Sequence, residues 1–129
     1  MEPKEGRILL VEDDRFLRKA AEATLRQRGF HVLTAVDGEE GLRLARAEAP
    51  DLILLDLIMP KMQGFEVLRI LKQDPATAGI PVIVLSNLGQ ESDVRQAMEA
   101  GALAYCVKAN LSLQDLVKRA EEALEGVKR

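Results

Sequence analysis

Five short apolar runs alternate with longer amphipathic stretches along this chain, and this alternation restricts the possible folds more than any other feature. The runs are Arg7–Val11, His31–Ala35, Leu52–Leu55, Pro81–Leu85 and Leu103–Val107. Each has about the length of a β-strand, and their nearly continuous apolar character predicts strands that are covered on both faces. The stretches between them have helical spacing, most clearly over residues 113–127. The chain therefore predicts five consecutive strand–helix units.

Strand–helix units in succession predict an α/β fold with a parallel sheet, because each right-handed crossover places its helix against the sheet. By analogy with flavodoxin-like proteins, we expect a doubly wound, five-stranded parallel sheet with strand order 2-1-3-4-5. The length of 129 residues is that of one domain. We expect residues 1–6 to be a polar leader and residues 7–129 to form this single domain, without a separate output domain.

The composition disfavours several classes of function. The net charge is -3, whereas binding to a nucleic-acid backbone requires a dense positive surface, so we expect no direct nucleic-acid partner. No stretch approaches the roughly 20 apolar residues of a membrane span, so we expect no membrane insertion. The one cysteine, Cys106, can form no internal disulfide. We therefore expect a cytoplasmic protein.

Acidic, hydroxylic and basic residues stand where four of the predicted strands end. Glu12 and Asp13 follow the first strand, Asp56 the third, Ser86 the fourth and Lys108 the fifth. Because ligands of doubly wound sheets bind beyond the carboxyl ends of the strands, we expect these side chains to share one rim. Carboxylates gathered in one place repel one another unless a cation compensates them, and oxygen ligands of this kind suit Mg²⁺. The sequence therefore predicts a magnesium site at this rim.

Asp56 differs from the other acids because it closes a strand that should be buried on both sides. A carboxylate can act as a nucleophile toward phosphorus and form an aspartyl-phosphate. Phosphoryl transfer needs mainly in-line positioning and charge neutralisation. We expect the metal, the Lys108 ammonium and the Ser86 hydroxyl to supply that neutralisation. A lone aspartate at a strand end often only caps a loop. Several polar sites that converge on one rim instead indicate an active site.

Four motifs in this order resemble the receiver domain of bacterial response regulators (CheY-like), which act in two-component signal transduction. They are residues 8–14 (ILLVEDD), residues 51–60 (DLILLDLIMP) with Gly64 after them, Ser86, and residues 105–108 (YCVK). Each motif alone is weakly specific, whereas the ordered set is highly specific and spans nearly the whole chain. The resemblance implies a phosphorylation-controlled signalling switch rather than an enzyme that turns over an external metabolite.

Carried over residue by residue, the resemblance implies a role for each rim residue. Asp56 would accept the phosphoryl group. Glu12 and Asp13 would bind Mg²⁺ together with Asp56 and the main-chain carbonyl of Ile58. Lys108 would contact the phosphoryl group. The donor would be a phosphohistidine on a sensor histidine kinase or on a histidine phosphotransfer protein.

The resemblance also implies a conformational switch that uses Ser86 and Tyr105. Ser86 would be drawn toward the phosphoryl oxygens, and Tyr105 would then turn inward. The face made by the fourth helix, the strand 103–107 and the helix 113–127 would change shape as a result. This face would bind a downstream protein effector, and a homodimer formed through it is a further expectation.

Three residues depart from the family pattern. Ala109 stands where a proline usually follows the lysine, and Asn87 stands where a small residue is usual. Ile58 offers no polar side chain to orient an attacking water, and neither does Leu88, so we expect a comparatively long-lived phosphoryl group. The main alternative is a receiver-like module that binds its partner independently of phosphorylation. A Mg²⁺-dependent phosphatase is less favoured, because such sites usually carry a second acid where Ile58 stands.

Overall fold

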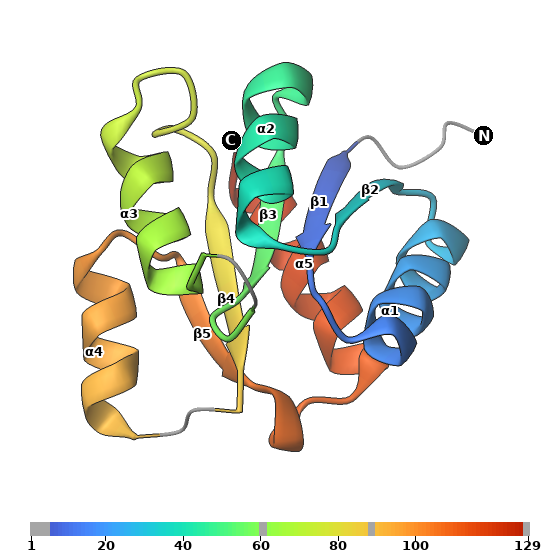
Figure 1. Cartoon of the computed structure of the whole chain (residues 1–129). Coiled ribbons are helices and arrows are strands. Elements are labelled where there is room, and N and C mark those ends of the chain that lie inside the picture. Colours follow the sequence, from blue (N-terminus) through green and yellow to red (C-terminus); the bar gives the residue numbers. More distant parts are fainter. Residues whose placement is uncertain (1–5, 60–61, 88–89, 128–129) are drawn as a thin grey trace.

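The computed structural model describes residues 6–59, 62–87 and 90–127. The elements along the chain are β1 (Arg7–Val11), α1 (Arg15–Gln27), β2 (His31–Ala35), α2 (Gly38–Glu48), β3 (Leu52–Asp56), α3 (Gly64–Gln73), β4 (Val82–Ser86), α4 (Glu91–Glu99), β5 (Ala104–Val107), the 3-10 helix η1 (Lys108–Asn110) and α5 (Leu113–Val127). The strands are parallel and form one sheet in the order β2-β1-β3-β4-β5 (Figure 1). The predicted fold class and strand order are therefore confirmed.

Two apolar cores cover the two faces of the sheet. The helices α1 and α5 pack on one face, and α2, α3 and α4 pack on the other (Figure 1). Successive strand residues alternate between the cores: in β1, Ile8 and Leu10 pack with α1 and α5, whereas Leu9 and Val11 pack with the helices opposite. Because a strand with both faces buried has no solvent side, its residues are apolar throughout. This explains the continuous apolar runs in the sequence.

Side chains cap the N-termini of α1 and α5. Asp14 Oδ1 accepts hydrogen bonds from the N–H groups of Phe16 and Leu17, at 2.9 and 3.1 Å. Ser112 Oγ accepts from the Asp115 N–H at 3.0 Å, and the Asp115 carboxylate accepts in return from the Ser112 N–H at 3.2 Å. Such caps satisfy N–H groups that have no partner within the helix. The Asp14 cap also sets where α1 begins, directly after the two predicted metal ligands.

The register of the sheet brings the ends of its central strands together. β1 and β3 are paired through Val11 and Leu55, so the residues that follow, Glu12 and Asp56, lie at one level. The strands β4 and β5 end beside them, with Ser86 as the last residue of β4. The polar residues that the sequence places at four strand ends therefore meet at one edge of the sheet.

Two further expectations concern the chain as a whole. Within the ranges that the structure describes, no helix is long and apolar enough to cross a membrane. Of the predicted leader, residues 1–5 lie outside the described residues. Gly6 is buried, and its carbonyl accepts a hydrogen bond from the His31 N–H at 3.0 Å, so it continues the pairing of β1 with β2.

Candidate functional site

Lys108 bridges two carboxylates at the carboxyl ends of the strands. Its Nζ lies 2.7 Å from Glu12 Oε1 and 3.0 Å from Asp56 Oδ2. The side chains are largely withdrawn from solvent, with exposed fractions of 17% for Lys108, 1% for Glu12 and 5% for Asp56. When both acids are charged, one ammonium leaves this cluster with an excess negative charge. The predicted rim is therefore present, and its charge favours a further cation.

Glu12 carries an electrostatic penalty at the rim. Burial raises its pKa from 4.5 to about 7, although the contacts with Lys108 and with the Asp14 N–H oppose this rise. The nearby Asp56 carboxylate raises the pKa further by like-charge repulsion. Oε1 of Glu12 pairs with the Lys108 ammonium at 2.7 Å, and it has no other partner among the described residues. A buried carboxylate beside a second acid is suited to bind a metal ion.

Three carboxylates fit the requirements of a magnesium site. One oxygen each of Glu12, Asp13 and Asp56 lies within 4.8 Å of the others. The donors are all oxygen, which favours Mg²⁺, and Asp13 is exposed, so that water can complete the coordination shell. The fourth predicted ligand, the main-chain carbonyl of Ile58, stays a prediction. The Ile58 N–H donates to Asp56 Oδ1 at 3.2 Å, which holds the loop after β3 against that carboxylate.

The two predicted switch residues are in contact with each other. Ser86 is fully buried at the end of β4, and Tyr105 is half-buried on β5. Burial raises the pKa of the Tyr105 hydroxyl, a hydrogen bond with the Ser86 side chain opposes this, and the Asp93 and Asp56 carboxylates add to the rise. This contact links the rim physically to β5.

Arg18 belongs to the rim, although the sequence alone does not single it out. Its Nη1 donates to the main-chain carbonyl oxygens of Glu12 and Asp13, at 3.0 and 3.2 Å. The available signal is its position: helical side chains lean toward the N-terminus of their helix, so an arginine one turn into α1 can reach the preceding loop. Arg18 therefore supports the backbone that carries Glu12 and Asp13.

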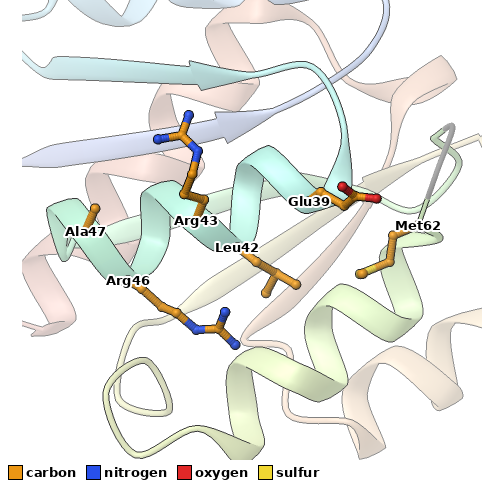
Figure 2. A pocket seen from close by; sticks show the side chains of 6 residues that line it. All are labelled: Glu39, Leu42, Arg43, Arg46, Ala47 and Met62. Carbon is orange, nitrogen blue, oxygen red and sulfur yellow. The ribbon is translucent and has the colours of Figure 1, made fainter.

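A groove of about 500 Å³ lies between α2 and the residues before α3 (Figure 2). Its lining residues are Glu39, Leu42, Arg43, Arg46, Ala47 and Met62. None of them belongs to the rim. Arg46 pairs with Asp74 at 3.0 Å, which ties α2 to the end of α3. The groove is therefore separate from the candidate site.

Comparison with models of known protein families matches residues 8–121 to the response regulator receiver domain. The chain belongs to this family. The matched segment contains the whole rim, and it confirms the family that the motifs indicate. A receiver domain is a signalling module rather than a classical enzyme, and receiver domains partner with histidine kinases.

Similar proteins include regulators from several bacteria. The transcriptional regulatory protein AfsQ1 of Streptomyces coelicolor is 43% identical over 101 residues, which cover 78% of this receiver and 44% of AfsQ1. The receiver domain of the Francisella response regulator 1452 has a TM-score of 0.89 at 25% identity, covering 95% and 99% of the two chains. The BeF3-activated receiver domain of Klebsiella pneumoniae RstA has a TM-score of 0.84 at 26% identity, covering 92% and 97%.

The relatives with curated functions are longer than the present chain. The chain spans 15% of the Myxococcus xanthus gliding motility regulatory protein and 51% of the Synechocystis regulator RpaA, and the shares for AfsQ1 and the other similar regulators lie between these values. The part shared with these relatives is therefore the receiver domain with its rim. The activities named for the longer relatives are properties of those whole proteins.

The raised pKa of Glu12 predicts a pH-dependent stability of the metal-free receiver. The folded state binds the Glu12 proton more tightly than the unfolded chain, so stability falls as the pH rises from about 4.5 to about 7. The loss is about 3 kcal/mol. Mg²⁺ should offset it, with a larger thermal stabilisation above the Glu12 pKa than below it. Thermal unfolding measured across pH with and without Mg²⁺ tests this.

The Glu12→Gln variant is the control for this pH dependence, because it removes the titrating group with little change in size. Its stability should vary less than that of the wild type across the same pH interval. Equal slopes for the two proteins would contradict the assignment of this titration to Glu12.

Proposed function

We propose that this receiver accepts a phosphoryl group on Asp56 from a phosphohistidine of a sensor histidine kinase or a histidine phosphotransfer protein. One observation carries the proposal: the Asp56 carboxylate ends a buried strand 3.0 Å from the Lys108 ammonium and within 4.8 Å of two further acids. The nucleophile, the Lys108 ammonium and three carboxylates that could hold Mg²⁺ are thereby brought to one point. This is the arrangement that phosphoryl transfer needs.

The transfer would use the rim residues in distinct roles. An Asp56 oxygen attacks the phosphorus in line, the bond from phosphorus to the histidine nitrogen breaks, and the imidazole leaves with the electron pair and takes up a proton. Lys108 would move its ammonium from the carboxylate toward a phosphoryl oxygen. Glu12, Asp13 and Asp56 would hold Mg²⁺. When bound, this ion neutralises charge on the phosphoryl oxygens.

The output would follow from the contact between Ser86 and Tyr105. A phosphoryl group adds a charge of about -1.5 to -2 and strong acceptor oxygens at the rim, so the Ser86 hydroxyl would donate to it. Tyr105 would then adjust its packing on β5, and the face of α4, β5 and α5 would change shape. Met98 and Leu103 are 44% and 51% exposed near this face. A downstream protein effector or a second copy of the receiver would bind there.

Phosphorylation with a small phosphodonor tests the proposal. Wild-type protein incubated with Mg²⁺ and acetyl phosphate should gain the mass of one phosphoryl group, located at Asp56, and Asp56→Asn should gain none. Asp51→Asn makes the same substitution at the opposite, exposed end of β3 and should keep the modification. A folded wild-type protein that stays unmodified would favour the phosphorylation-independent module.

The lifetime of the phosphoryl group is a second prediction from the rim. Ile58 is apolar and 56% exposed, so it presents no group that orients a water for attack on the phosphoryl-aspartate. Leu88, the other apolar position in this prediction, lies outside the described residues. We expect slow hydrolysis after the phosphodonor is removed, and faster hydrolysis in Ile58→Asn. The decay of the modified mass with time measures both. A wild-type half-life of only seconds would contradict this prediction.

A further inference from the structure

Arg18 holds both peptide groups that flank Asp13. The carbonyl of the first peptide, that of Glu12, accepts from Arg18 Nη1 at 3.0 Å, and the carbonyl of the second, that of Asp13, accepts from the same nitrogen at 3.2 Å. The second peptide is also held at its other end, because the Asp14 N–H donates to Glu12 Oε2 at 3.0 Å. The orientation of the backbone at Asp13 is thereby fixed from both sides.

Asp13 depends on this backbone support more than the other acids of the rim do. The carboxylates of Glu12 and Asp56 are buried and contact Lys108. The Asp13 side chain is exposed, and within the described ranges its carboxylate has no hydrogen bond or ion pair of its own. Its direction is therefore set by the main chain from which it projects, and Arg18 fixes that main chain.

The helix that carries Arg18 is itself attached to the same loop. The Arg18 N–H donates to the Asp14 carbonyl at 2.9 Å in the first turn of α1, and the Asp14 side chain caps that turn. The guanidinium thus reaches back from a rigid helix, and its Nη1 donates to both carbonyls. Arg15, the first residue of the same helix, is exposed and makes no corresponding contact with the rim among the described residues.

We propose that Arg18 is a positioning residue for the metal site: it orients the Asp13 carboxylate toward the ion through the two peptide groups that flank Asp13. This inference rests on the proposed function. Groups that orient metal ligands without touching the metal typically change its affinity by about 10–100-fold when they are removed. We therefore expect Arg18→Gln to weaken Mg²⁺ binding by about 10-fold or more.

The experiment separates positioning from charge and from general stability. The dissociation constant for Mg²⁺ is measured from the thermal stabilisation of the unphosphorylated protein, for wild type, Arg18→Gln, Arg18→Lys and Arg15→Gln. The Mg²⁺ concentration for half-maximal phosphorylation by acetyl phosphate is measured alongside, together with the rate at saturating Mg²⁺. Arg15→Gln removes the same charge from the same helix and should bind Mg²⁺ like the wild type.

Arg18→Gln should need more Mg²⁺ for half-maximal phosphorylation and should recover most of the wild-type rate at saturation. A merely structural role would lower the melting temperature without changing the Mg²⁺ dependence, and that result would overturn the proposal. An equal loss of affinity in Arg15→Gln would overturn it too, because charge alone would then suffice. If Arg18→Gln does not fold, Arg18→Lys decides: it keeps the charge, but its ammonium is one bond closer to the backbone than the Arg18 Nη1 that donates to both carbonyls. Wild-type Mg²⁺ affinity in this variant would contradict the positioning role.

The wild-type protein distinguishes failure of this inference from failure of the proposed function. A wild type that binds no Mg²⁺ and accepts no phosphoryl group contradicts both. A wild type that does both, with an Arg18→Gln variant that needs no additional Mg²⁺, contradicts only the role of Arg18.

Discussion

Replacing Lys108 with methionine should lower the free energy of unfolding of the metal-free receiver by about 3 kcal/mol at a pH above the Glu12 pKa. The substitution removes the ammonium that lies within 3.0 Å of both the Glu12 and Asp56 carboxylates. Two buried acids of like charge would then face each other without compensation, which is more costly than an intact buried pair. Chemical denaturation of the wild type and the variant measures the difference.

The cause of this loss can be checked with two changes of condition and one control variant. Well below the Glu12 pKa of about 7, Glu12 is protonated in the folded state, so the loss should shrink. Saturating Mg²⁺ should also reduce it, because the ion compensates the same carboxylates. Lys118→Met, at an exposed position of α5, should change the stability by no more than about 0.5 kcal/mol. A loss in Lys108→Met that is independent of both pH and Mg²⁺ would point to packing instead of charge.

The fold was predictable because each strand is buried on both faces. This burial requires apolar residues throughout a strand, and such runs are visible without any structure. The strand order rests on analogy with doubly wound sheets, because an apolar run does not encode which strand lies beside it. The apolar runs predict ends for β3 and β4 that lie one residue before the observed ends. Asp56 is polar, and its pairing with Leu85 shows that the ladder continues where the apolar character stops.

The sequence predicts which residues meet at the rim. It does not predict their burial or their contacts. Parallel strands bring their carboxyl ends to one edge, so polar residues at those ends must meet. The sequence does not show that Glu12 is buried with a raised pKa while its neighbour Asp13 is exposed. Nor does it show the role of Arg18, because the acceptors are main-chain carbonyls that every residue possesses. Contacts of this kind depend on three-dimensional placement and leave no pattern in the residue types.

A large effect of a single added carbon is expected at Gly64, the first residue of α3. A Cβ built there would lie 2.4 Å from the Leu57 Cα and 2.5 Å from the Asp56 carbonyl oxygen. Both are backbone atoms, so no side chain can rotate away to relieve the overlap. The Gly64 N–H also donates to the Leu57 carbonyl at 2.8 Å, which holds α3 close to the end of β3. Gly64→Ala should therefore lower the free energy of unfolding by about 3 kcal/mol.

This substitution should also impair the site, because the peptide that must move joins Asp56 to Leu57. The folded fraction of Gly64→Ala should accept a phosphoryl group from acetyl phosphate more slowly than the wild type at saturating Mg²⁺. Gly79→Ala is the matched control, since a Cβ at Gly79 meets no atom within 4 Å. That variant should keep its phosphorylation rate and differ in stability by no more than about 0.5–1 kcal/mol. If Gly64→Ala proved as stable and as reactive as Gly79→Ala, the close approach of α3 to β3 would not constrain the Asp56 carboxylate.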